Sequence, residues 1–169
     1  MTKSDTRNEI IWRQFGASLD MLQNAIEACP DGLWGDTPGF QEYWYIAFHT
    51  LFWADLYLHG PVEGFQPPEP FGLEELDSSG AFPDQIYSKQ ELINYVDHCR
   101  EKLRQIVSGL TDEEVAKTIT HGKRSMSFEE LLWYNMRHVQ HHTAQLNLLL
   151  RQSDSVVPEW VSRTSKDLP

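Results

Sequence analysis

Apolar residues recur at helical spacing over much of the chain. Across residues 5–29 they return every three or four positions, at Ile10, Ile11, Phe15, Leu19, Leu22 and Ile26. This spacing places them on one face of an α-helix. Pro30-Asp31-Gly32 follows and predicts the end of that helix. We therefore expect an amphipathic first helix that buries one face.

A second helical segment is more apolar and rich in aromatic residues. We expect it over residues 39–59, where Gly60-Pro61 ends it. The segment that follows, residues 61–87, is rich in proline and glycine. Such a long connection is unusual inside a compact domain. In a helical bundle it allows two successive helices to run in the same direction.

Signals for helix N-termini mark the rest of the chain. Ser88, Thr111 and Ser127 each stand three positions before a glutamate. In such a capping box the two residues satisfy each other's backbone N–H groups. The first box opens a third helix, which Gly109 ends, and the second opens a short extra turn. The third opens a fourth helix that runs to about residue 152.

These segments predict an all-α fold, a four-helix bundle formed by residues 1–152. The residues 121–124, His-Gly-Lys-Arg, are typical of a turn, and the alternation expected of strands is almost absent. Residues 153–169 form a tail that we expect to pack on the bundle, with Trp160 as its anchor.

Charge and composition narrow the class of partner. The 169-residue chain carries a formal net charge of -11 and has no run of basic residues, so nucleic acid is not an expected partner. No apolar run is long enough to span a membrane. The N-terminus lacks the apolar core of a secretory signal, and Cys29 and Cys99 are therefore expected as reduced thiols. We expect a cytoplasmic protein.

The seven histidines are candidates for chemistry, and three of them are expected to point inward. His138 and His142 are four positions apart and lie within the apolar stripe of the fourth helix. His49 lies on the apolar face of the second helix, whereas His141 falls toward the edge of its stripe. A buried imidazole needs partners for both ring nitrogens, and backbone carbonyls can supply them. Because three inward histidines are costly to bury without a ligand, a metal site on His49, His138 and His142 is the favoured interpretation.

Two polar residues are candidates for a catalytic role beside these histidines. Glu42 falls on the same helical face as His49, two turns away, and is a candidate for handling a proton. Alternatively, it is a solvated carboxylate at the start of a helix. Asn135 precedes His138 by one turn and is a candidate for contacting a substrate. Four aromatic residues could line a pocket or belong to the core: Tyr45, Trp53, Trp133 and Tyr134.

Two sequence stretches carry a family resemblance. Residues 46–55 read Ile-Ala-Phe-His-Thr-Leu-Phe-Trp-Ala-Asp, and residues 138–145 read His-Val-Gln-His-His-Thr-Ala-Gln. Their order and placement on helices resemble the DinB/YfiT-like superfamily, which includes damage-inducible DinB proteins and thiol-dependent S-transferases. The resemblance implies an up-down-down-up four-helix bundle and metal ligation by His49, His138 and His142. Relatives often have Gly-Gln after the last ligand, where this chain has Thr143-Ala144-Gln145.

Two functions remain open from the sequence. Three imidazoles leave a coordination position open, as in catalytic sites, and suit zinc, nickel, iron or copper. The chain would then be a metal-dependent hydrolase or S-transferase that activates water or a low-molecular-weight thiol for a small-molecule substrate. The alternative is a non-catalytic metal-binding or stress-related protein, in which a cysteine or carboxylate completes the coordination. The resemblance also implies a homodimer.

Overall fold

Four long helices form the body of the protein. The computed structural model describes residues 3–35, 39 and 41–168. Within them the long helices are α1 (Lys3–Ala28), α3 (Tyr43–His59), α4 (Lys89–Ser108) and α6 (Phe128–Gln152). Shorter elements are α2 (Asp31–Trp34), α5 (Asp112–Ala116) and the 3-10 helix η1 (Glu74–Leu76). The prediction of a mainly helical fold is confirmed.

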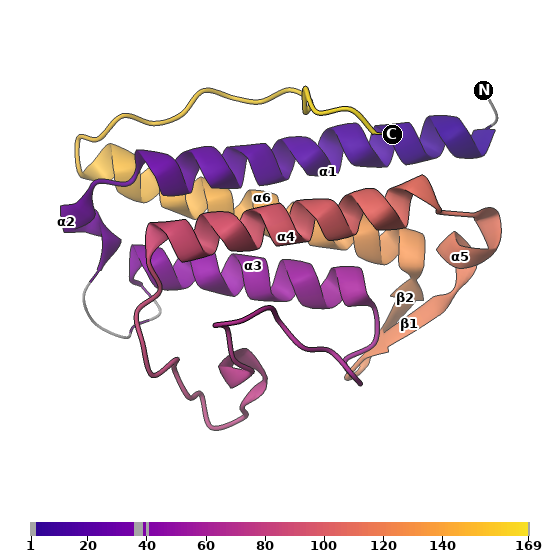
Figure 1. Ribbon diagram of the computed structural model, residues 1–169, viewed down its shortest axis with the longest axis horizontal. Helices are drawn as coiled ribbons and strands as arrows, with labels where there is room; N and C mark the ends of the chain where they lie inside the picture. The colour runs from indigo at the N-terminus through magenta and orange to yellow at the C-terminus, as the bar shows by residue number, and fades with distance from the viewer. Residues whose placement is uncertain (1–2, 36–38, 40, 169) are drawn as a thin grey trace.

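The long helices lie side by side (Figure 1). Their buried side chains form a hydrophobic core. Both α1 and α3 pack against α4 and α6. Most of α3 is buried, which accounts for its apolar composition. The connection between α3 and α4 lies along the outside of α3 and carries η1 (Figure 1). The largest fully buried side chains include Trp12, Trp44, Tyr43, Tyr87 and Tyr95.

The helix boundaries differ from the predictions mainly in α3. This helix begins at Tyr43, after Glu42, whose extended backbone (φ -70, ψ 139) places it at the N-cap. The predicted start near residue 39 was therefore too early, although Phe40 lies outside the described residues. An apolar run does not show where the helical backbone begins, because residues that flank a helix can be buried without being helical.

The predicted capping residues occupy their expected positions. Ser88 and Thr111 each accept a hydrogen bond from the backbone N–H of the glutamate three residues on. The side chain of that glutamate in turn accepts a hydrogen bond from the backbone N–H of the capping residue. Ser127 accepts from the backbone N–H of Glu130 at the start of α6. These contacts satisfy N–H groups that have no partner within the helix.

A short β-hairpin precedes α6 and was not predicted. The strands β1 (Thr118–His121) and β2 (Arg124–Ser127) pair antiparallel, with Ile119 opposite Met126. The predicted turn at residues 121–124 is the tip of this hairpin, and Gly122 there adopts φ +59, which favours glycine. Four-residue strands give too little alternation to be distinguished from a loop by sequence pattern.

The C-terminal tail lies along α1 (Figure 1). The indole of Trp12 donates a hydrogen bond to the carbonyl of Lys166 at 2.7 Å. The backbone N–H of Thr164, which is buried, donates to the carbonyl of Arg13. Trp160, by contrast, is 69% exposed and does not anchor the tail. Hydrogen bonds to α1, rather than burial of an aromatic ring, therefore hold this segment.

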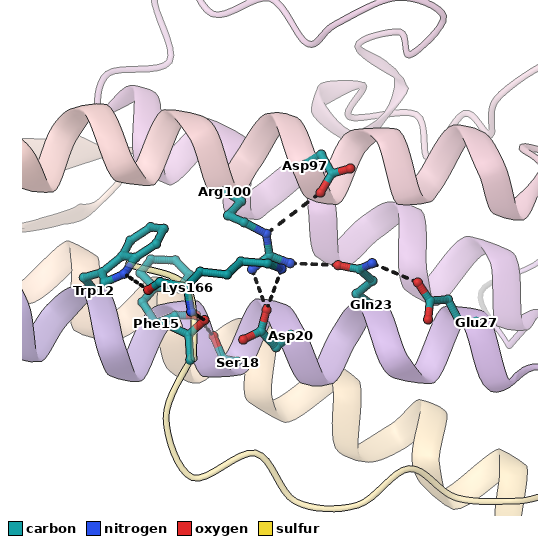
Figure 2. A network of polar contacts seen from close by, with 10 residues as sticks. Trp12, Phe15, Ser18, Asp20, Gln23, Glu27, Asp97, Arg100 and Lys166 are labelled. Carbon is teal, nitrogen blue, oxygen red and sulfur yellow. Dashed lines mark hydrogen bonds and ion pairs between the residues drawn. The ribbon is translucent and has the colours of Figure 1, made fainter. Parts of the chain in front are cut away.

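A polar network joins the tail to the bundle (Figure 2). The guanidinium of Arg100 in α4 bonds Asp20 at 2.7 Å and Gln23 at 2.9 Å, both in α1. Lys166 from the tail reaches the same oxygen of Asp20 at 3.1 Å. Burial raises the pKa of Asp20, but hydrogen bonding to Thr164 and the charges of Arg100 and Lys166 hold it below the ordinary value. One carboxylate thus links α1, α4 and the tail.

None of the helices in the described part of the chain combines the length and the apolar character that a membrane span requires.

Candidate metal centre

The structure brings His49, His138 and His142 together between α3 and α6. One possible ligand atom from each residue lies within 4.8 Å of the other two. The ring centroid of His49 is 5.5 Å from that of His138 and 4.8 Å from that of His142. The two rings of α6 are 4.6 Å apart. His141 is exposed, in agreement with its predicted position at the edge of the stripe.

Helix geometry and packing produce this convergence. Residues four apart in a helix lie one turn apart on the same face, which brings the rings of His138 and His142 close. Because α3 packs directly against α6, His49 faces that pair. All three side chains are partly buried, with the His49 side chain 30% exposed. The cluster therefore lies at the margin of the core, where a small molecule can reach it.

Glu75 is the partner of His49, and sequence reasoning missed it. Its Oε2 atom lies 2.7 Å from Nδ1 of His49 and 2.7 Å from the indole nitrogen of Trp53, which donates to it. Its Oε1 accepts from the hydroxyl of Tyr45 at 2.5 Å. Burial raises the pKa of Glu75, but these hydrogen bonds and the nearby His49 hold it below the ordinary value. The carboxylate is thus ionised at neutral pH and can only accept.

The partners of His49 and His142 fix which nitrogen of each ring carries the proton. Because Glu75 accepts, Nδ1 of His49 carries the proton and Nε2 keeps a lone pair. Nδ1 of His142 lies 2.6 Å from the amide oxygen of Gln145, which likewise assigns the proton to Nδ1. Both rings are therefore oriented by a second residue and are left with Nε2 as a donor atom for a metal.

His138 has an unsatisfied nitrogen in the cluster. Its Nε2 is buried and makes no hydrogen bond in the described part of the chain. Burial lowers the pKa of His138 to about 3, assisted by the neighbouring His142, His49 and His141, while the Thr50 backbone acts in the opposite direction. The ring is therefore neutral at pH 7. A buried polar atom without a partner is costly, and a metal ion would satisfy it.

A cleft opens onto the cluster from one side. It has a volume of about 440 Å³, and its wall includes Tyr45, Ile46, His49, His142 and Leu149. This volume is within the range of small-molecule sites. His49 and His142 are thus accessible from a mainly apolar cavity.

The two other predicted residues, Glu42 and Asn135, have contacts of their own outside the three histidines. The carboxylate of Glu42 lies against Gly35, since a Cβ added there would be 2.1 Å from Glu42 Oε2. Asn135 is fully buried and its amide donates to the carbonyl of Ala54 at 2.8 Å. Asn135 thus links α6 to α3, and its Oδ1 has no partner in the described part of the chain.

Nothing in the local sequence identifies Glu75 as a partner of His49. It lies in η1, within the connection, and is separated from His49 by 26 positions. The connection has no periodic pattern that would orient its side chains. The one available signal is a pair of glutamates, Glu74 and Glu75, beside the apolar Leu73 and Leu76 in a long loop.

The fold and cluster define a helical protein with three histidines converging at the junction of two helices. The chain belongs to the DinB superfamily, whose family model matches residues 14–146. This confirms the resemblance carried by the two histidine-containing stretches. A search of curated proteins finds no match.

Two solved structures share the fold. A DinB-like protein from Bacillus cereus superposes with a TM-score of 0.62 at 18% identity, covering 85% of this chain and 91% of its own. A DinB-like protein from Bacillus subtilis, YjoA, superposes with a TM-score of 0.64 at 16% identity, covering 91% and 99% respectively. At these identities the similarity concerns the fold.

Proposed function

We propose that this protein is a metal-dependent enzyme in which His49, His138 and His142 bind one divalent transition metal such as zinc, nickel or iron. The observation that carries the proposal is the buried Nε2 of His138, which lacks a partner among the described residues beside two rings whose Nε2 atoms keep lone pairs. Three neutral imidazoles are a donor set that suits these metals.

The surroundings of the cluster favour catalysis over a purely structural ion. A structural site has four protein ligands, whereas a catalytic site keeps a position for water or substrate. In the described part of the chain, the group that could hold a metal consists of the three histidines alone. The Glu75 carboxylate is engaged by His49, Tyr45 and Trp53.

The residues around this site have different roles. When bound, the metal would supply a Lewis acid that activates water or a low-molecular-weight thiol. Glu75 and Gln145 orient the rings of His49 and His142. Ile46 and Leu149 line the cleft and would hold the apolar part of a small-molecule substrate. Hydrolysis and thiol transfer are the two reaction classes that this arrangement supports.

Three further predictions accompany this proposal. The four long helices are proposed to form an up-down-down-up bundle, supported by the directions in Figure 1, where α3 and α4 run from left to right and α1 and α6 the other way. The division into a bundle at 1–152 and a packed tail at 153–169 is supported by the hydrogen bonds of Lys166 and Thr164 to α1. We also expect a homodimer. Light scattering of the purified protein tests this by measuring its molar mass in solution.

Elemental analysis of untagged protein tests the metal site. We expect about one equivalent of metal in the wild type and loss of it in His49→Ala and His138→Ala. His141→Ala is the matched control, because His141 belongs to the same helix but is exposed. Equal metal content in all four proteins would refute the site.

A conjugation assay separates the two reaction classes. The metal-loaded protein is incubated with electrophiles in the presence and absence of glutathione, bacillithiol or mycothiol. Thiol-dependent product formation supports S-transfer, and thiol-independent hydrolysis supports activation of water. Absence of both reactions across the panel would favour the non-catalytic metal-binding alternative.

A further inference from the structure

A second cavity lies between the β-hairpin and α3, on another side of the histidine cluster. It has a volume of about 320 Å³ and is lined by residues of the hairpin, α3, α6 and the connection. We call it the hairpin cavity. Three aromatic side chains, Trp53, Tyr57 and Tyr134, form part of its wall, and Lys123 and Arg124 lie at the hairpin tip.

The aromatic side chains of the hairpin cavity form a continuous packed surface. The ring of Tyr57 is 5.5 Å from that of Trp53 and meets the ring of Tyr134 edge-on at 5.3 Å. His121 packs edge-on against Tyr57 at 5.3 Å. Since these rings hold one another in place, they offer a flat apolar ligand a preformed surface.

The charges of the hairpin cavity are opposite to those of the protein as a whole. The chain has 25 acidic and 14 basic residues, yet among the described residues no aspartate or glutamate lines the cavity. Arg124 donates to the hydroxyl of Tyr134 at 3.0 Å, which directs its guanidinium along the aromatic wall. Neither Lys123 nor Arg124 forms an ion pair in the described part of the chain, whereas Lys102 and Arg100 both hold buried or half-buried carboxylates. Two cations beside an apolar wall suit an anion with an apolar body.

The hairpin cavity also adjoins the histidine cluster. Trp53 lines the cavity and donates to the same Glu75 oxygen that contacts His49. The ring of Tyr57 stands perpendicular to that of His138, with centroids 6.0 Å apart. Leu76, the neighbour of Glu75 in η1, lines the cavity as well. A ligand bound here would contact residues that support the proposed metal centre.

We propose that the hairpin cavity binds a small aromatic carboxylate, with the carboxylate on Lys123 and Arg124 and the ring against Trp53, Tyr57 and Tyr134. The proposal goes beyond the metal chemistry and does not require a metal. The ligand is defined by two features at once, a negative charge and a flat apolar body, and each is tested with a molecule that lacks it.

Calorimetric titration of chelator-treated, metal-free protein provides the test. The probes are benzoate, its neutral analogue benzamide, and acetate, which has the charge without the ring. We expect benzoate to bind at least about tenfold more tightly than either analogue, because both kinds of contact contribute. Equal binding of benzoate and benzamide, or no benzoate binding at millimolar concentration, would overturn the proposal.

Variants locate the binding site. The double substitution Lys123→Gln with Arg124→Gln is expected to weaken benzoate binding by about tenfold or more. Lys117→Gln with Arg151→Gln removes the same charge outside the cavity and is expected to bind benzoate normally. Arg124→Lys keeps the charge and is expected to retain most of the binding. Unchanged affinity in the first double variant, or an equal loss in both double variants, would refute the site.

The two proposals fail independently of each other. Benzoate binding is measured without metal, so it stands if His49→Ala leaves the metal content unchanged. Conversely, the double variant at the hairpin tip is expected to retain the wild-type metal content, since Lys123 and Arg124 do not belong to the histidine cluster.

Discussion

Replacement of Glu75 by glutamine is expected to weaken metal binding about tenfold while leaving the protein folded. The carboxylate accepts from His49 and Trp53 on Oε2 and from Tyr45 on Oε1. A glutamine can place its carbonyl oxygen at the position of Oε2 and turn its amide toward the Tyr45 hydroxyl, which can accept. The number of hydrogen bonds is then preserved, and the change is the loss of the negative charge.

The magnitude follows from what that charge does. A carboxylate behind a ligating imidazole makes the ring more basic and fixes its orientation, and loss of such a partner costs about 10- to 100-fold in metal affinity. Glutamine preserves the orientation, so we expect the lower end, about 1.4 kcal/mol. The free energy of unfolding should change by only about 1 kcal/mol, because relief from burying a carboxylate offsets the weaker hydrogen bonds.

Comparison of Glu75→Ala with Glu75→Gln separates the effect of orienting the His49 ring from the effect of the negative charge. The alanine variant leaves three donors without their acceptor, at a cost of about 1–3 kcal/mol for each that stays buried. Tyr45 is buried, whereas His49 and Trp53 are partly exposed, so we expect a loss of about 3 kcal/mol in the free energy of unfolding and a loss of metal affinity toward 100-fold. Urea unfolding of the metal-free protein measures the first quantity, and competition with a chromophoric zinc chelator measures the second.

Glu63→Gln is the matched control for charge. Glu63 is an exposed carboxylate in the same connection, so its replacement changes the net charge equally without touching the cluster. If Glu75→Gln bound zinc as tightly as the wild type and Glu63→Gln, then Glu75 would not support His49 as a ligand.

Three further predictions concern stability. Asp55 is fully buried against Lys102, and although burial raises its pKa, hydrogen bonds and charge from its partners hold the pKa below the ordinary value. The contribution of ionised Asp55 to the free energy of unfolding is therefore present above about pH 4 and is lost as the pH falls through the folded-state pKa. Asp55→Asn should cost about 3 kcal/mol at pH 7 and less at pH 3 in urea unfolding, and an equal cost at both pH values would contradict this. A Cβ on Gly16 would lie 2.6 Å from Cγ2 of Thr164 and 3.0 Å from its Cβ, so Gly16→Ala should lower the melting temperature in the wild type and lower it less in a Thr164→Ser background. Additive effects of the two changes would argue against that contact. Ser88→Ala removes the N-cap of α4 and should cost about 1 kcal/mol in the free energy of unfolding; no loss would mean that water replaces the cap.

The helices, and the three histidines as inward-facing positions on them, could be predicted from the sequence because the relevant information is local. Apolar spacing and capping residues identify a helix within a few turns, and His138 and His142 share a face through the helical repeat alone. Within the described residues, the boundary error in α3 arose at its start, which was predicted from composition rather than from backbone geometry.

What only the tertiary structure decided concerns contacts between distant segments. Glu75 reaches His49 from a loop without periodicity, and the amide of Asn135 donates to the α3 backbone. The hairpin brings Lys123 and Arg124 to aromatic rings of α3 and α6. The sequence by itself determined which faces are apolar and where helices begin, since these depend on neighbours along the chain. Which nitrogen of each histidine faces the cluster depends on partners that only folding brings within hydrogen-bonding distance.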